Sequence, residues 1–426
     1  MNQLNESSLD GFNIDNSKFK FNILLLSLVG PGVLAAMGDN DAGGIISYCV
    51  TGAKFGVSLF IPLSICLSIL TYTVQEMSMR LGTVSQKGFI ALIGEYYGNF
   101  WMKYHLYTLL FQNILMLTTE FMGMTAGLIV IGVPPWMGTV ISLGFILSII
   151  TFSGYLKKER IALLMGILNM VFVLIAFMVK PDIPSMVNAF VNWNYHGYSH
   201  NLLWYIAAIV GNSVAPWMIF FQGSAYIDKG VVAEHIHLGR IDIRIGCIVQ
   251  VIIAVCIIIS GTALFGQIVN IENAGPALVI KALANHMGKA AGILFAVGIF
   301  NAGLLASITI TLSSSWCAAE AFKWPHSLND KISEAPKFYT VYIGSVIVAA
   351  CVVLIPNLPL NYMALATQVI GGLLIIPILI FLVMFTNKEE IMGKYKNSLF
   401  VNIRACIVTV LLIGAALFFI CYSLIS

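Results

Sequence analysis

The sequence has little charge, and this scarcity decides its class. Charged residues make up 10% of the 426 residues, whereas apolar residues make up 59% and the mean hydropathy is +0.92. This composition excludes a soluble protein, because a water-exposed surface of that size carries far more charge. The net charge of +3 does not indicate a nucleic-acid partner. The chain is therefore predicted to be an all-α integral membrane protein whose surroundings are the lipid bilayer, and a monomer is compatible with its sequence.

Cysteine and histidine, which bind soft metals or build redox sites, form no recognisable motif in this sequence. The eight cysteines include no CxxC pair and lie in or beside apolar stretches, which is typical of small buried hydrophobic residues. None of the seven histidines falls in the middle of a predicted span. The first twenty residues are polar and contain Asp and Glu, so no cleavable signal peptide is predicted. We therefore expect no cofactor and no enzymatic activity.

Apolar segments predict about eleven membrane-spanning helices. Most contain the roughly 20 residues needed to cross a hydrocarbon core of about 30 Å. Of the 22 Lys and Arg residues, eighteen fall on the N-terminal side of the membrane, so the positive-inside rule predicts a cytoplasmic N-terminus and an extracytoplasmic C-terminus. The predicted spans are residues 22–49, 55–80, 104–132, 134–153, 159–179, 202–227, 241–268, 291–316, 338–355, 360–386 and 399–424.

A polar break interrupts the first span. It consists of Gly38-Asp39-Asn40-Asp41-Ala42-Gly43-Gly44, with apolar sequence on both sides. Carboxylates at membrane depth are costly and mark ion paths or partners, and the glycines allow the helix to unwind and free its carbonyl groups. Irregular backbone is tolerated there only inside protein or along a water-filled path. The break therefore predicts a cation site in a secondary transporter.

A second break lies in the sixth span, at Gly211-Asn212-Ser213-Val214-Ala215-Pro216-Trp217. Pro216 lacks an N–H group and prevents a continuous hydrogen-bond ladder. A simple proline kink would explain this segment, but interrupted spans at matching positions of two halves indicate an inverted repeat with a site at the midplane. The predicted division is a cytoplasmic tail over residues 1–21, a first repeat over 22–180, a second repeat over 202–386 and an added span over 399–426.

Two more polar side chains lie deep in predicted spans. Glu120 follows two threonines in the third span, and Gln368 falls early in the tenth. Glu120 is either bonded to its threonine neighbours or part of a pathway, and a lone Gln such as Gln368 often holds helices together. Glu76 precedes Arg80 by four residues, which predicts a local ion pair. With neither Met nor Cys inside the breaks, the oxygen-rich surroundings suit hard ions such as Mg²⁺ or Ca²⁺.

The chain also resembles the NRAMP divalent-metal transporters over nearly its whole length. The resemblance rests on Gly30-Pro31-Gly32, on Arg80-Leu81-Gly82-Thr83-Val84, on Thr386-Asn387-Lys388-Glu389-Glu390-Ile391-Met392-Gly393, and on the spacing from Gln368 to Thr386. Each motif is short, but together and in order on eleven spans they are specific. The resemblance implies a LeuT-type fold, built as a 5+5 inverted repeat with broken helices 1 and 6, in a bacterial inner membrane.

The chain departs from this family at the first and sixth spans. The family motif Asp-Pro-Gly-Asn reads Asp41-Ala42-Gly43-Gly44 here, so Asp41 matches the metal-binding Asp and Gly44 replaces the Asn ligand. The motif Met-Pro-His reads Ala215-Pro216-Trp217, so the Met associated with selectivity has become Ala215 and the His has become Trp217.

In the third span, the family's Asp, and the Glu three residues later, correspond to Glu120 and Gly123. By resemblance, Gln368 and the carbonyls near Gly38 and Asn212 are still plausible metal ligands. The pattern is similar to the NRAMP-related magnesium transporters of bacteria. Loss of the thioether removes a reason to prefer transition metals, and loss of the His and of one acid argues against proton coupling.

We therefore expect an importer of Mg²⁺, with Mn²⁺ as a further substrate, that works by alternating access without proton coupling. Asp41 would carry the main charge for the ion, Asp39 and Asn40 would extend the polar rim or hold ion-bound water, and Gln368 would contribute from the tenth span. There are three alternatives. A proton-coupled Mn²⁺/Fe²⁺ transporter would need a sulfur ligand, and a sodium-coupled amino-acid carrier on the same scaffold would need a binding site for a carboxylate. A membrane sensor would move no ions.

Overall fold

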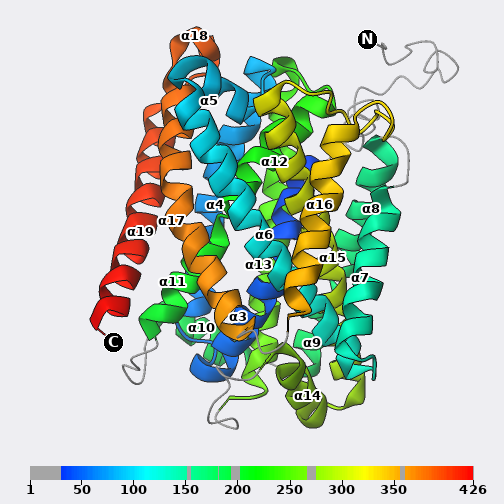
Figure 1. Cartoon of the computed structure of the whole chain (residues 1–426). Coiled ribbons are helices and arrows are strands. Elements are labelled where there is room, and N and C mark those ends of the chain that lie inside the picture. The colour runs from blue at the N-terminus through cyan, green and yellow to red at the C-terminus, as the bar shows by residue number, and fades with distance from the viewer. Residues whose placement is uncertain are drawn as a thin grey trace, which may run out of the picture.

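The protein is a bundle of helices that run along one long axis (Figure 1). The computed structural model describes residues 30–150, 155–180, 182–192, 202–265, 275–355 and 360–425, so the tail predicted over residues 1–21 lies outside it. Within these ranges every regular element is a helix. Among the described residues, eight helices are long and apolar enough to cross a membrane, and a bent pair gives a ninth. The predicted all-α membrane fold is confirmed.

The eleven predicted spans correspond to single helices or to interrupted pairs. The first five are α2 with α3 (Pro31–Asp39, Ala42–Phe55), α4 (Phe60–Ser85), α6 (Asn99–Val130), α7 (Pro135–Ile150) and α8 with α9 (Tyr155–Leu168, Val171–Met178). The next five are α11 with α12 (Leu202–Ser213, Pro216–Asp228), α13 (Ile236–Thr262), α15 (Lys289–Phe322), α16 (Pro336–Val353) and α17 (Leu360–Asn387). The last is α19 (Leu399–Ile425). The pieces α2 and α3 are each too short to cross a membrane alone.

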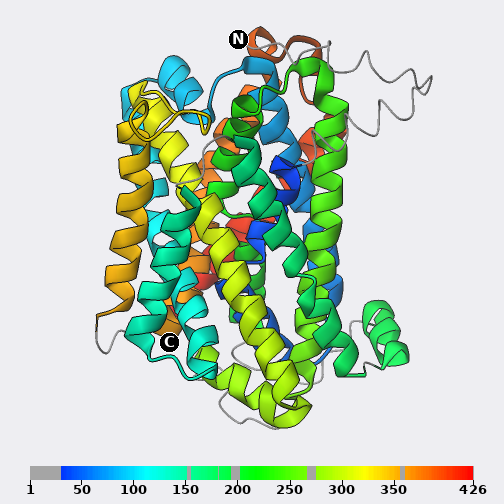
Figure 2. The ribbon, with the colours of Figure 1, turned by 90° about the vertical axis from the view of Figure 1, so that its right-hand side faces the viewer.

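Short helices cover the two ends of the bundle. One end carries α5 (Phe89–Tyr97), η2 (Ala233–His235), α18 (Glu389–Met392) and η4 (Gly393–Tyr395). The opposite end carries α10 (Ile183–Asn192) and α14 (Pro276–Met287) (Figure 1). In the view of Figure 2, α10 projects sideways from that end. We call the end with α5 and α18 the basic end, because many of the chain's Lys and Arg residues flank its helices.

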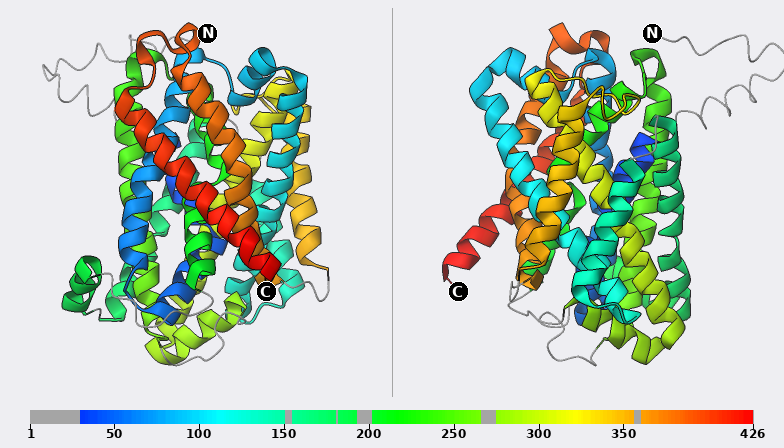
Figure 3. Two further views of the ribbon diagram at one scale, coloured as in Figure 1. Left: turned by 90° about the vertical axis from the view of Figure 1, so that its left-hand side faces the viewer. Right: turned by 45° about the vertical axis from the view of Figure 1, so that its right-hand side comes forward.

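The interior is built on close packing of small residues. The helices α6 and α15 pack along much of their length, and α13 packs against α2, α3 and α4. Where α3 crosses α13, a β-carbon on Gly52 would lie 1.9 Å from the carbonyl oxygen of Ile258, and one on Gly261 would lie 2.0 Å from that of Cys49. Only glycine permits such an approach, which is how membrane helices gain packing energy. On the outside, α19 runs obliquely across α17 (Figure 3).

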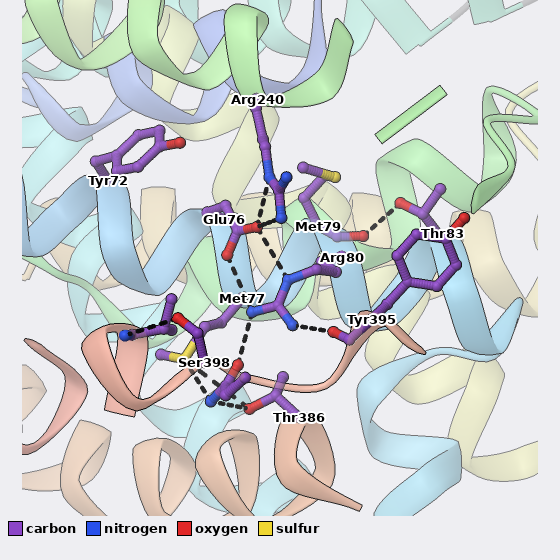
Figure 4. A network of polar contacts seen from close by, with 12 residues as sticks. Tyr72, Glu76, Met77, Met79, Arg80, Thr83, Arg240, Thr386, Tyr395 and Ser398 are labelled. Carbon is purple, nitrogen blue, oxygen red and sulfur yellow. Dashed lines mark hydrogen bonds and ion pairs between the residues drawn. The ribbon is translucent and has the colours of Figure 1, made fainter. Parts of the chain in front are cut away.

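A polar network at the basic end ties α4 to α13 and to the segment between α17 and α19 (Figure 4). Arg80 Nε donates to Glu76 Oε1 at 2.9 Å, which confirms the predicted local pair, and Arg240 of α13 donates to the same oxygen at 2.9 Å. Arg80 also donates to the carbonyl of Tyr395 and, at 2.6 Å, to Asn397 Oδ1. The network therefore fixes three helical segments to one another beside the bilayer core.

Candidate metal centre

The first break separates α2 from α3 and buries both of its carboxylates. The helix α2 ends at Asp39, and Asp41 has an extended backbone with φ −72° and ψ 170°. Asp41 is the N-cap of α3, and its Oδ1 accepts the N–H of Gly44 at 2.5 Å. An Asp at this position satisfies one of the free N–H groups at the start of a helix. The side chain that the sequence placed at the metal therefore also holds the broken helix in shape.

The second break separates α11 from α12. Ala215 has an extended backbone and Pro216 occupies the first position of α12, where its missing N–H costs no hydrogen bond. The N–H of Ala215 donates to the sulfur of Met218 at 3.4 Å. A thioether therefore lies beside this break from one turn further along, although in this conformation its sulfur accepts a backbone hydrogen bond.

The two breaks meet beside Gly44. A β-carbon on Gly44 would lie 2.6 Å from Asn212 Nδ2, 2.9 Å from Asn212 Oδ1 and 3.0 Å from Asp41 Oδ1. Because all three atoms surround one glycine, the carboxylate of the first break and the amide of the second lie next to each other. The structure thus brings together two of the predicted site residues that are far apart in the sequence.

Two further helices reach the same place beside Gly43. A β-carbon on Gly43 would lie 3.2 Å from Gln368 Nε2, 3.5 Å from Asp41 Oδ1 and 3.5 Å from Thr119 Oγ1. Gln368 is buried on α17 beside the Asp41 carboxyl, with its Nε2 outside hydrogen-bond geometry to any partner. The centre therefore gathers carboxylate, amide and hydroxyl groups from four helical segments. We call Asp41, Thr119, Asn212 and Gln368 the break cluster.

Glu120 belongs to α6, and its carboxyl group contacts the start of α3. Its Oε2 accepts the N–H of Ala42 at 2.9 Å, and Thr119 Oγ1 lies 3.5 Å from its other carboxyl oxygen. The N-terminus of a helix favours a nearby negative charge. Glu120 and Asp41 thus satisfy two of the N–H groups that the break leaves free.

Asp39 and Asn40 contact α13 through Gln250. The Asn40 side chain donates to the Gln250 carbonyl at 3.0 Å, and the Gln250 amide donates to Asp39 Oδ2. Tyr48 accepts from Asn212 Nδ2 at 3.3 Å. Gln250, Tyr48 and Thr119 were absent from the candidate residues predicted from sequence, although a lone Gln within an apolar span is a signal that could have revealed Gln250.

The chain is similar to known proteins along most of its length. The family model described as "Natural resistance-associated macrophage protein-like", Nramp, matches residues 32–422. The chain belongs to the Nramp family. A divalent metal cation transporter MntH of Staphylococcus saprophyticus is 26% identical over 440 residues and covers 96% of each chain. A Nramp 2 homolog of Dictyostelium discoideum is 25% identical and covers 95% of this chain and 65% of its own.

Solved structures support the same fold for this Nramp protein. The manganese transporter of Eremococcus coleocola, in complex with an aromatic bis-isothiourea compound, has a TM-score of 0.77 at 18% identity and covers 95% of this chain and 88% of its own. MhsT in complex with L-phenylalanine has a TM-score of 0.57 at 14% identity, with 92% and 98% covered. These likenesses confirm the LeuT-type architecture.

The positions where this Nramp chain departs from the family motifs are tightly packed. Trp217 is fully buried, and a β-carbon on Gly38 would lie 3.2 Å from its ring and 2.8 Å from Thr309 Oγ1. A β-carbon on Gly123 would lie 2.3 Å from that of Ala42, so an acidic side chain does not fit there without movement of α3. Gly123 therefore lets α6 pack directly against Ala42 at the start of α3.

Within the described ranges no group of three or more His, Cys, Asp or Glu side chains is placed to hold a metal ion. The break cluster instead combines one carboxylate with two side-chain amides and a hydroxyl group. Such oxygen donors suit a hard ion that keeps some of its own water. Gly43 and Gly44 lie beside these groups and, as glycines, place no side chain among them.

Proposed function

We propose that the protein is a secondary transporter that imports divalent metal cations by alternating access. The observation that carries the proposal is the convergence of Asp41, Asn212 and Gln368 beside Gly43 and Gly44, where two interrupted helices meet. Helix breaks at the midplane expose carbonyl groups and helix ends that bind ions. The relatives named as divalent metal cation transporters support the same substrate class and no enzymatic activity.

We infer that Mg²⁺ is the main substrate and that Mn²⁺ is also accepted. Ala215 stands where the family motif has Met, and the nearby Met218 sulfur is hydrogen-bonded to the Ala215 N–H. Thioether ligands favour soft ions, whereas Mg²⁺ prefers oxygen and retains water. The relatives that are named for manganese keep a Mn²⁺ or Fe²⁺ transporter as the alternative.

Uptake without proton coupling is part of the proposal. Trp217 cannot carry a proton, Gly123 supplies no acid, and Glu120 is engaged with the Ala42 N–H. A divalent ion that crosses the full membrane field gains about 4.6 kcal/mol per 100 mV, twice the value for one charge. This corresponds to a concentration ratio of roughly 2000-fold, so the membrane potential suffices for accumulation.

The proposed orientation places the basic end in the cytoplasm. At that end Asp242 of α13 accepts the N–H groups of Gly30, Gly32 and Val33 at 3.1, 2.8 and 3.1 Å. These bonds tie the start of α2 to α13. In the proposed cycle they break when α2 moves to open the cytoplasmic path, with residues 22–180 and 202–386 acting as the two repeats.

The test is uptake into proteoliposomes at a fixed membrane potential. Mg²⁺, Mn²⁺ and Ca²⁺ are supplied separately, and internal indicators report the metal and the pH together. We expect saturable Mg²⁺ uptake that Mn²⁺ inhibits, with no metal-dependent acidification. Metal-dependent acidification would refute the uncoupled mechanism, and uptake of Mn²⁺ without Mg²⁺ would favour the alternative. Uptake of an amino acid, as MhsT-like architecture permits, would contradict the substrate class.

A further inference from the structure

A cavity that includes several charged residues lies at the basic end, away from the break cluster. Its volume is about 660 Å³, and it lies between the end of α4, the start of α5, α12, the end of α15 and the loop that follows α15. None of the break-cluster residues lines it. Its lining residues include Ser224, Asp228 and Glu320.

Glu320 is the unusual residue of this cavity. It is 8% exposed, and its Oε1 accepts the Ser224 hydroxyl at 2.5 Å. Its Oε2 is buried and has no hydrogen-bond partner. A β-carbon on Gly88 would lie 1.8 Å from that oxygen, so the carboxylate lies against the start of α5. A buried carboxylate oxygen without a donor is costly, and a counter-ion would remove that cost.

The start of α5 offers a simpler role for Glu320, because a helix N-terminus attracts a carboxylate. None of the N–H groups of α5 donates to the unpartnered Oε2, however. The cavity's other charges leave it open to a cation. Asp228 accepts the Leu328 N–H at 2.8 Å and also bonds the Ser327 side chain, and Lys87 is paired with Glu95 at 2.6 Å. Lys323 also lines the cavity, and its positive charge opposes the binding of a cation. The remaining acidic side chain is Asp330, and the imidazole is that of His326.

Aromatic side chains connect the two sites. On α12, Trp217 and Phe221 have ring centroids 6.0 Å apart, and Phe221 lies 5.7 Å from Trp316 of α15. Ser224 follows Phe221 by three residues and Glu320 follows Trp316 by four. Residues at these spacings share one face of a helix. The ring contacts therefore run from Trp217, which packs beside Gly38, through Phe221 to Trp316, on the helix faces that carry Ser224 and Glu320.

We propose that this cavity is a second, weaker site for a hydrated divalent cation, held by Glu320 with Asp228 beside it. The proposal rests on the transport of divalent cations proposed above. The ion keeps most of its water, because no group of three suitable ligands is present among the described residues. Mg²⁺ in particular binds through one or two carboxylates and retained waters. In the proposed cycle, an ion released from the break cluster towards the basic end meets Glu320 before it leaves the protein.

The experiment counts bound ions on the full chain in detergent, with Mn²⁺ as the probe. Free Mn²⁺ is measured by electron paramagnetic resonance over micromolar to millimolar concentrations. We expect two bound ions in the unmodified protein and one each in Asp41→Asn and Glu320→Gln. The double variant is expected to bind none. Glu234→Gln, a matched change of an exposed glutamate at the same end, is expected to bind two.

Gly88→Ala provides an independent variant that keeps every charge. The added methyl group would occupy the place of Glu320 Oε2 and displace the carboxylate, so the weaker ion is lost while the tighter one stays. Equal binding by Asp41→Asn and by the double variant would overturn the proposal, as would a single ion in the unmodified protein. Neither result touches transport through the break cluster. Two bound ions without any uptake would instead contradict the proposed function.

Discussion

Replacing Asp41 separates its two roles, because Asn and Ala remove different parts of it. Asn is as good an N-cap as Asp, so Asp41→Asn keeps an acceptor for the Gly44 N–H while removing the charge. Asp41→Ala removes both and is expected to cost about 0.5–2 kcal/mol of stability. Two unit charges about 4 Å apart attract by roughly 4 kcal/mol at an effective dielectric constant of about 20, so a divalent ion gains about 8 kcal/mol before desolvation.

Desolvation of the ion and of Asp41 offsets most of that attraction. A net loss of only about 2 kcal/mol already weakens binding roughly thirtyfold. We therefore expect Asp41→Asn to raise the half-saturating Mg²⁺ concentration by at least this factor, or to abolish uptake. We expect this variant to keep the melting temperature of the unmodified protein. Uptake across a range of Mg²⁺ concentrations and thermal unfolding in detergent measure the two effects. Unchanged uptake by Asp41→Asn would refute the assignment, and equal destabilisation by both variants would refute the capping role.

Three further predictions concern selectivity and stability. Ala215→Met is expected to shift competition in uptake assays from Mg²⁺ towards Mn²⁺ and Cd²⁺, because a thioether is a soft ligand; unchanged competition would exclude Ala215 from selectivity. Glu76→Gln leaves two arginines without their carboxylate and is expected to lower stability by about 3–5 kcal/mol, seen as a lower melting temperature with Glu234→Gln as the control. Gly52→Ala is expected to cost 1–3 kcal/mol or more through overlap with the Ile258 carbonyl, and a melting temperature equal to that of the unmodified protein would contradict the helix crossing.

The breaks and their principal residues could be predicted from the sequence because they violate the rules of an apolar helix. Asp41 and Asn212 stand out where glycine or proline interrupts a hydrophobic run. The structure places both, with Gln368, around the same two glycines. Their roles as metal ligands remain proposals, as do the coupling mechanism and the orientation.

The partners of these residues could not be predicted, because hydropathy gives the depth of a residue and not the helix that it faces. Asp39 and Asn40 both contact Gln250, which is more than two hundred residues away in the sequence. The same limit applies to Gly123, whose small size is explained only by its contact with Ala42. The packing of Gly44 is equally hidden in the sequence, since a side chain there would overlap Asn212.

The capping of α3 explains how a broken helix persists inside an apolar bundle. Unwinding frees N–H groups, and each unsatisfied group is costly at membrane depth. Asp41 satisfies the N–H group of Gly44, three residues away, and Glu120 satisfies that of Ala42, 78 residues away. Because Glu120 lies on α6, a movement of α3 during the proposed cycle must either carry α6 with it or exchange the Ala42–Glu120 hydrogen bond for another. We therefore propose that Glu120 is a positioning residue of that cycle even when no proton moves.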